Sequence, residues 1–201
     1  MYEIKKINKS ICGTDDSVWD VANTANIKNT WPGFDYVPKT TAKLLYNDFG
    51  IYLRLETDES PLLARFRNQN DDVCRDSCME FFCRPNENDP RYLVFEFNPF
   101  GTMHFAIRKS LTEAETPAQD KHFFNVTTLV DDKKWVLSFC IPFAFIDEKF
   151  GSHTKTMYGN LYKCGDDLPQ RHYVTYYPVK TEAPAFHKPE FFGKFILRES
   201  R

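Results

Sequence analysis

The stretch RYLVFEFNPFGTMHFAIR, from Arg91 to Arg108, determines the fold class that this sequence predicts. In its second half the apolar residues Met103, Phe105 and Ile107 alternate with other residues, which is the period-two pattern of a β-strand with one buried face. The segment NPFG (98–101) between the two halves carries the asparagine, proline and glycine typical of turns. We therefore predict a β-hairpin.

The same alternation recurs along the chain, from Ile51 to Leu55 and from Trp135 to Ile141. Shorter strand candidates are Leu44 to Asn47, Met79 to Cys83, Phe123 to Thr127, Met157 to Lys163 and Phe191 to Leu197. Only Pro142 to Phe150, with a proline at its start and Gly151 after it, is predicted to be helical. We expect an all-β fold, a two-sheet antiparallel β-sandwich of the jelly-roll or immunoglobulin-like type with little helix.

Composition narrows the class of protein. The 201 residues show no repeat or Gly/Ser linker, so we expect one β-sandwich domain over residues 1–201. The 26 basic and 28 acidic residues are interspersed, which argues against nucleic acid and membrane partners. There is no apolar run typical of a membrane span or signal peptide. The chain as it stands predicts a cytoplasmic protein, whereas a module cut from a larger secreted protein would look the same.

Six cysteines are many for this length, and three of them lie in CRDSCMEFFCRP (74–85). They lack the paired CxxC spacing of zinc ribbons, so we favour free, buried thiols over disulfides, and disulfides over zinc. On a strand Cys78 and Cys83 point to opposite faces and do not converge on one ion. A redox or metal pair of Cys78 with Cys164 is an alternative.

Four segments together resemble the carbohydrate-binding module family 9-like domains. They are DSCMEFFCRP (76–85), RYLVFEFNPFGTM (91–103), GNLYKCGDDL (159–168) and FHKPEFFGKF (186–195). The early DDSVWDVA (15–22) is similar to the Asp-x-x-Trp element that opens these domains. The resemblance spans nearly the whole chain, in order.

The resemblance implies a β-sandwich that binds a saccharide and does no chemistry of its own. Sugar-binding members stack a sugar at a reducing end between two tryptophans, while a carboxylate and other polar groups hold its hydroxyls. Such modules accompany polysaccharide-degrading enzymes, so a glycoside hydrolase is the implied protein partner. No cofactor is required, and calcium is implied as a structural ion in some members.

The resemblance also points to individual residues. The carboxylate of the DSxxE strand corresponds to Glu80, the glutamine of the late strand falls at Tyr162, and the late tryptophan falls at Phe186 or His187. We expect these four residues to converge on an aromatic-lined groove. A pyranose presents C–H groups to aromatic rings and hydroxyls to polar side chains, which suits this set.

The sequence departs from the family pattern at two positions. The tryptophan expected before the carboxylate falls near Val73 or Cys74, and an arginine of the next strand falls near Val94. One aromatic plate and one donor are therefore missing. As replacements we consider Arg75 or Lys163 for the donor and Trp31 or Tyr162 for the aromatic face, with Glu96 as a second carboxylate.

Several of these residues have a structural alternative. Glu80 and Glu96 could be salt-bridged strand carboxylates, and His187 could order the turn before Pro189. Trp19 and Trp135 are predicted to pack in the core. Trp31, on a loop before Pro32-Gly33, is the tryptophan most suited to exposure, or else it anchors that loop on the sandwich. His172 is a further but less favoured candidate.

Two other functions compete with sugar binding. A small enzyme could act on a glycoside through Glu80, Glu96 and His187, although the sequence has no hydrolase motif such as HExxH or GxSxG. A degenerate sandwich could serve only protein interaction, which predicts an exposed apolar patch instead of a pocket. We favour the non-catalytic carbohydrate-binding domain.

Overall fold

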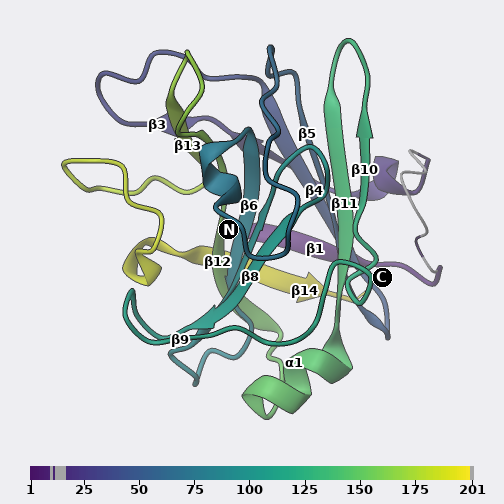
Figure 1. The fold of residues 1–201 in the computed structure, drawn as a ribbon. Helices are drawn as coiled ribbons and strands as arrows, with labels where there is room; N and C mark the ends of the chain where they lie inside the picture. Colours follow the sequence, from purple (N-terminus) through teal and green to yellow (C-terminus); the bar gives the residue numbers. More distant parts are fainter. Residues whose placement is uncertain (10, 12–16, 200–201) are drawn as a thin grey trace.

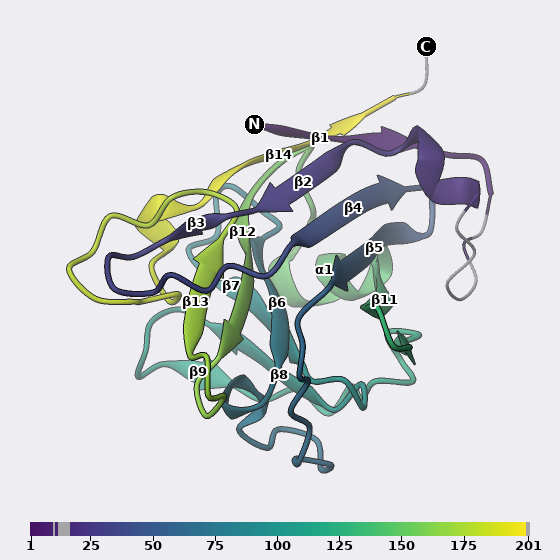
Figure 2. The same ribbon diagram turned by 90° about the horizontal axis from the view of Figure 1, so that it is seen from above.

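The computed structural model describes residues 1–9, 11 and 17–199 of the chain, and the first part of the predicted DDSVWDVA element, Asp15 and Asp16, lies outside them. Most of its strands form a single hydrogen-bonded path in the order β10-β11-β5-β4-β1-β14-β12-β6-β7-β8-β9, and β2, β3 and β13 pair off this path. The path curls so that its two ends form two layers (Figures 1 and 2). The predicted all-β architecture is confirmed.

Each layer has its own set of strands. The β5 layer contains β10 (Thr127–Val130), β11 (Trp135–Pro142), β5 (Gly50–Thr57), β4 (Thr40–Tyr46) and β2 (Thr24–Ile27), which pairs with β4. The β6 layer contains β12 (Thr156–Gly165), β6 (Cys78–Arg84), β7 (Tyr92–Phe97), β8 (Met103–Arg108) and β9 (Ala114–Glu115). Between the layers run β1 (Tyr2–Lys6) and β14 (Gly193–Arg198), while β13 (His172–Thr175) pairs with β12 and with β3 (Asn29–Thr30).

The described strands pair antiparallel except at β1, which runs parallel to both β4 and β14. The main core lies between the layers, where the ring centroids of Phe97 and Phe139 are 4.8 Å apart. Burying apolar area of this kind supplies most of the driving force for folding. The prediction of an antiparallel sheet is therefore correct for every described pairing that does not involve β1.

The predicted hairpin is present as β7 and β8, paired from Tyr92 with Arg108 to Phe97 with Met103. Its turn places Gly101 at a φ of +67°, which glycine adopts without a steric penalty. The Gly101 N–H donates to the Asn98 carbonyl at 2.8 Å. The predicted helix is present as α1 (Phe143–Phe150), which starts after Pro142 and ends at Gly151.

One strand prediction is wrong. Phe123 to Asn125 form a turn instead of a strand, because the Asp120 carboxylate accepts the N–H groups of His122 and Phe123 and Asn125 takes a positive φ of 51°. The strand β10 begins only at Thr127. Phe124 is nevertheless fully buried, packing on Phe105 at 4.9 Å.

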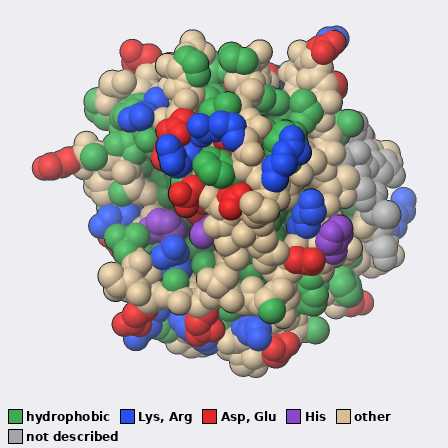
Figure 3. All heavy atoms as spheres, in the orientation of Figure 1, with side chains coloured by type: hydrophobic (Ala, Val, Ile, Leu, Met, Phe, Trp, Pro, Cys, Tyr) green, Lys and Arg blue, Asp and Glu red, His purple; other side chains and the backbone are tan. Residues whose placement is uncertain are grey.

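Tryptophans and cysteines pack largely as expected. Trp19 and Trp135 are 1% and 0% exposed, although Trp19 lies on the short 3-10 helix η1 (Ser17–Val21) rather than on a strand. The five cysteines within the described residues are free, and Cys12 lies outside them. On the face drawn in Figure 3, basic and acidic side chains are interspersed with apolar ones. In the described part of the chain no helix is long and apolar enough to cross a membrane.

Candidate functional site

A row of side chains crosses the outer face of the β6 layer. Register pairs Tyr162 with Glu80, Glu80 with Glu96, and Glu96 with His104, across β12, β6, β7 and β8. Residues directly opposite on neighbouring strands have Cβ atoms about 5 Å apart. The alternation of the strands therefore brings two carboxyl groups, Glu80 and Glu96, side by side.

The segment 177–192 and its neighbours cover this row. They enclose a cavity of about 260 Å³. It is lined by Cys74, Glu80, Glu96, Cys164, Asp166, Tyr173, Pro184, Ala185, Phe186 and His187. Four of the eight residues proposed from the sequence thus meet in one cavity, namely Glu80, Glu96, Phe186 and His187.

The carboxyl pair is buried. Glu80 is 2% exposed and Glu96 is 8% exposed, and the Cys164 thiol donates a hydrogen bond of 3.0 Å to Glu80 Oε1. Burial raises the pKa of both carboxyl groups, that of Glu96 to about 7, and repulsion by Glu96 raises the pKa of Glu80 further. Since like charges this close resist joint ionisation, the pair favours keeping a proton at neutral pH.

The aromatic wall of the cavity is the half-buried ring of Phe186. Its partner Tyr162 stacks behind it, with ring centroids 4.3 Å apart and an interplanar angle of 15°. The Tyr162 hydroxyl also donates to the Phe186 carbonyl at 3.0 Å, which fixes the segment on the sheet. Tyr162 therefore supports the wall and does not line the cavity.

His187 lies beside Phe186 on the same segment. Its ring stacks on that of Phe82 with centroids 4.8 Å apart, and its Nδ1 is 3.3 Å from the Tyr92 hydroxyl. Burial lowers the pKa of His187 to about 4, so the ring is neutral at physiological pH. His187 therefore lines the cavity and also orders the segment, while its donation to a sugar hydroxyl stays a prediction.

Trp31 is placed differently from the exposed position considered for it. It is 5% exposed, its Nε1 donates to the Thr181 carbonyl at 3.1 Å, and its ring is 6.0 Å from that of Phe186. Trp31 thus anchors its loop against the covering segment, which is the alternative reading. It offers no face to the cavity.

Lys163 lies on the opposite face of β12 from the cavity. It is fully buried, and its ammonium is 2.9 Å from Glu59 Oε1 and 3.0 Å from His172 Nε2. Because neighbouring strand residues alternate between faces, Lys163 turns away while Tyr162 and Cys164 turn toward the β6 outer face. The prediction of Lys163 and His172 as donors to a sugar is therefore wrong. Both belong to a buried ion cluster with Glu59.

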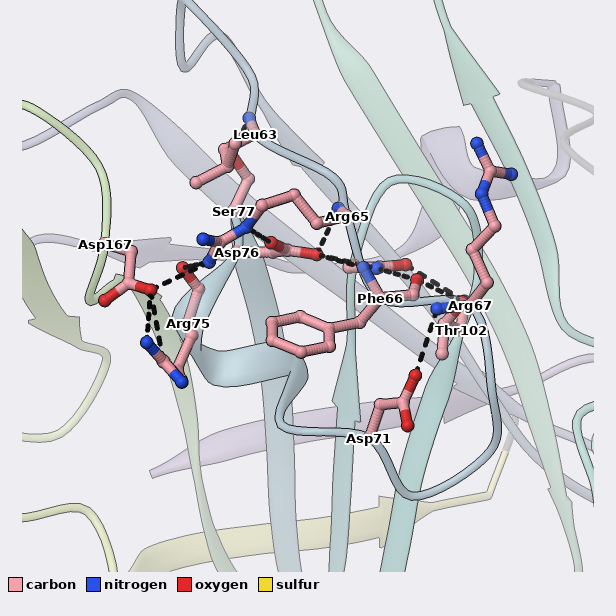
Figure 4. A network of polar contacts seen from close by, with 11 residues as sticks. Leu63, Arg65, Phe66, Arg67, Asp71, Arg75, Asp76, Ser77, Thr102 and Asp167 are labelled. Carbon is pink, nitrogen blue, oxygen red and sulfur yellow. Dashed lines mark hydrogen bonds and ion pairs between the residues drawn. The ribbon is translucent and has the colours of Figure 1, made fainter.

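Arg75 also lies outside the cavity lining. Its exposed guanidinium forms an ion pair of 2.9 Å with Asp167, which also pairs with Arg65 (Figure 4). Arg65 Nε in turn donates to Asp76, at 3.0 Å. Arg75 thus belongs to a surface ion network next to the cavity. Its predicted role as a sugar donor does not fit this position.

The acidic residue at the centre of this network, Asp76, has a structural task. It is fully buried and accepts hydrogen bonds from the backbone N–H groups of Arg65 and Phe66 and from Asn98 Nδ2 at 2.7 to 3.1 Å (Figure 4). The adjacent Ser77 hydroxyl accepts from the Leu63 N–H at 2.8 Å. The Asp-Ser pair therefore fastens the segment before β6, and only the later Glu80 reaches the cavity.

A cluster beneath the cavity could hold a metal ion. Ligand atoms of Cys78, Glu80 and Cys164 lie within 4.8 Å of one another, so the two cysteines considered as a pair are indeed neighbours. Two thiols and one carboxylate suit a thiophilic ion, whereas calcium takes six to eight oxygen ligands. This cluster does not fit the structural calcium implied by the resemblance, which stays a prediction.

Sequence reasoning missed Cys74, Asp166 and Tyr173 as lining residues. Asp166 and Tyr173 flank the turn between β12 and β13, and burial raises the pKa of both. The pairing of β13 with β12 brings them to the cavity, and that pairing has no local signal beyond the GDDL segment (165–168).

Comparison with known proteins identifies the family of the chain. The family model described as carbohydrate-binding family 9 matches residues 20–197. A putative carbohydrate-binding protein from Bacteroides uniformis ATCC 8492 has a similar structure, with a TM-score of 0.85, 26% identity and 98% of each chain covered. A search of curated proteins finds no match to this chain.

Two structures of a family 9 module from Caldicellulosiruptor kristjanssonii share the fold. The complex with cellotriose has a TM-score of 0.70 and 15% identity, covering 100% of this chain and 94% of that one. The complex with glucose has a TM-score of 0.69 and 16% identity, covering 99% and 96%. The match of the family model over most of the chain favours neither the enzyme nor the protein-interaction alternative. The chain belongs to carbohydrate-binding family 9, a family of non-catalytic sugar-binding modules.

Proposed function

We propose that the cavity on the β6 layer binds one ring of a saccharide. The observation that carries this proposal is the meeting of an aromatic wall, Phe186, with the buried carboxyl groups Glu80 and Glu96 in one concave site. The ring of Phe186 suits the C–H face of a pyranose, and the carboxyl groups accept hydrogen bonds from its hydroxyls. Tyr173 and His187 add polar atoms at the rim.

The size of the cavity supports a single ring. Its volume of about 260 Å³ is below the roughly 300 to 1,000 Å³ of pockets for drug-sized ligands. One face of Phe186 is already covered by Tyr162, so the sugar meets one aromatic plate and not two. We therefore expect a terminal sugar residue, held less tightly than between two tryptophans.

A larger hollow exists but suits a sugar less well. It measures about 1180 Å³ and lies along β1 and β14. Charged and aliphatic side chains such as Lys5, Ile196 and Arg198 line it, and no aromatic ring is among its lining residues. Without a ring to stack on, a pyranose loses the contact that most distinguishes sugar sites.

The relatives support the ligand class. The similar modules from Caldicellulosiruptor kristjanssonii were solved with cellotriose and glucose. We extend the proposal to a reducing end as the part recognised, and to a glycoside hydrolase as the enzyme that the module serves. Both points rest on the family, and the titration with alditols below tests the first of them.

Isothermal titration calorimetry with glucose, cellobiose and their alditols tests the proposal. Wild-type protein should bind a native sugar saturably, and a loss of binding to the alditol would identify the reducing end. Phe186→Ala should weaken binding on the order of tenfold or more. The matched control is Phe49→Ala, whose ring is 53% exposed and does not line the cavity.

Unchanged affinity in Phe186→Ala, or no saturable binding of any sugar by wild-type protein, would overturn the proposal. Because Phe186 also stacks on Tyr162, the variant's melting temperature should be recorded beside its affinity. Glu80→Gln keeps the shape of the cavity wall and gives a second test. It should weaken sugar binding by removing an ionisable acceptor while the fold persists.

A further inference from the structure

The cavity is lined with carboxyl groups and lacks strongly basic side chains to pair with them among the described residues. Three carboxyl groups line it, from Glu80, Glu96 and Asp166, and no lysine or arginine is among the described residues that line it. The two histidines nearby do not offset this, because burial lowers the pKa of His187, which lines the cavity, and that of His104, which faces Glu96 from β8. Both rings are neutral at physiological pH.

Glu96 is the most exceptional of the three acids. It is more than nine-tenths buried and lines the cavity, yet no hydrogen bond or ion pair reaches it from the described residues. Arg108 is the positive charge that lowers the pKa of Glu96, but its guanidinium donates to the Leu111 carbonyl and forms no described ion pair with Glu96. Buried polar groups in folded proteins normally have partners, and an unpaired carboxylate is costly.

The chain does compensate its buried acids outside the cavity. Glu59 has the Lys163 ammonium at 2.9 Å, and Asp76 has several N–H donors. The lack of a partner at Glu96 is therefore local to the cavity, where a ligand can supply one.

A neutral sugar would supply only part of the partner that Glu96 lacks. A hydroxyl donates one hydrogen bond and brings no charge, whereas an ammonium group donates three and balances the carboxylates. Hydrogen bonds between charged groups are roughly twice as strong as those between neutral groups. A ring that carries an ammonium group could stack on Phe186 and place the cation between Glu80 and Glu96.

We propose that the cavity selects a monosaccharide with a free amino group, such as a hexosamine, over its neutral and N-acetylated analogues. This inference rests on the proposed function, because it names the class of sugar bound at the same site. It is carried by Glu96, which is buried and has no partner among the described residues, and by a described cavity lining that contains neither lysine nor arginine.

The test is calorimetric titration of the full chain with glucosamine, glucose and N-acetylglucosamine near neutral pH. Glucosamine should bind on the order of tenfold more tightly than glucose, and added salt should reduce this ratio. Glu96→Gln should lower affinity for glucosamine more than for glucose and bring the ratio toward one. Glu182→Gln, which removes an exposed carboxylate from the covering segment outside the cavity lining, should leave the ratio unchanged.

The outcomes separate this inference from the proposed function. If glucose binds at least as tightly as glucosamine, the selectivity for amino sugars is wrong while the saccharide site stands. If no sugar binds, both fail. Parallel titrations with zinc chloride and with a chelator test the Cys78, Glu80 and Cys164 cluster, and a metal ion that binds there and blocks glucosamine would also overturn the inference.

Glu96→Gln is expected to fold, because it removes a buried ionisable group and keeps the side-chain shape. Should it fail to fold, the ratio of glucosamine to glucose affinity is measured in Asp166→Asn instead, since Asp166 also lines the cavity. This variant should likewise lower the ratio. A glucosamine-to-glucose ratio that stays unchanged in the folded variant would contradict the assignment of the ammonium to this group of acids.

Discussion

Two groups of buried acids on opposite faces of the β6 layer differ in how they are neutralised. Glu59 is fully enclosed with the ammonium of Lys163 and the ring of His172. Glu80 and Glu96 are buried almost as deeply, but no cation among the described residues pairs with them, and they border a cavity. The contrast shows that this chain can neutralise a buried carboxylate with a cation. It provides no such cation for Glu80 and Glu96, among the described residues, where a ligand has access.

The pKa values reflect the difference. Burial alone would raise the pKa of Glu59, yet the Lys163 ammonium and the hydrogen bond with His172 outweigh it, so the pKa is lowered. In the cavity burial dominates and the more distant Arg108 offsets it only in part, so the pKa of Glu96 rises to about 7. The first arrangement serves stability, and the second is typical of a functional site.

Lys163→Met gives the largest expected effect on the neutralised group. It leaves the Glu59 carboxylate buried without its ammonium, and such losses cost about 3 to 5 kcal/mol of unfolding free energy. Urea denaturation measures the change, with Lys180→Met at an exposed position as control. A loss below about 1 kcal/mol would show that Lys163 does not hold Glu59 in place.

Glu96→Gln should act in the opposite direction. Since the pKa of Glu96 is raised from 4.5 to about 7 in the folded state, the native protein binds more protons than the unfolded chain between these values. Wild-type stability should therefore fall as pH rises through that window, and the penalty is complete above about pH 7. The variant should flatten this dependence and gain on the order of 2 kcal/mol at alkaline pH.

Thermal melts of both proteins across that pH window measure the effect. The comparison is made without sugar, because a bound ligand would stabilise the folded state by mass action. Identical pH profiles for wild-type protein and Glu96→Gln would mean that Glu96 is neutralised by a partner after all.

Arg75→Ala should have the smallest effect. Its guanidinium is exposed, and Asp167 keeps its second ion pair, with Arg65, at 2.9 Å. Exposed ion pairs contribute between about 0 and 1 kcal/mol, so the melting temperature should change little. Sugar affinity should not change. A clear loss of affinity would return Arg75 to the binding site.

Much of the fold follows from local pattern. Alternation of apolar residues and turn chemistry predicted the β7–β8 hairpin, β5, β11 and α1. The strand β1 was missed, because its parallel pairing with β4 and β14 depends on distant residues and leaves no local signal. β13 was missed because it has only four residues, and its second partner, β3, is a two-residue strand far away in the sequence.

The site residues divide in the same way, into those that a local sequence pattern predicts and those that depend on tertiary structure. Glu80 was predicted from the DSxxE segment of the family resemblance and Glu96 from the alternation of the neighbouring strand, and the register pairs the two residues. The alternation that helped there also argues against Lys163, because a strand cannot direct Lys163 and Tyr162 to one face. Asp166 and Tyr173 could not be predicted, since only the folded chain brings them to the cavity.

The most direct test of the account is where a sugar binds. In two-dimensional ¹H–¹⁵N NMR spectra of the full chain, titration with glucose and with glucosamine should move amide signals saturably. The account predicts that the largest shifts fall on residues lining the cavity, such as Cys164, Asp166, Phe186 and His187. Saturable shifts confined to another region, such as the hollow beside Lys5 and Arg198, would contradict it.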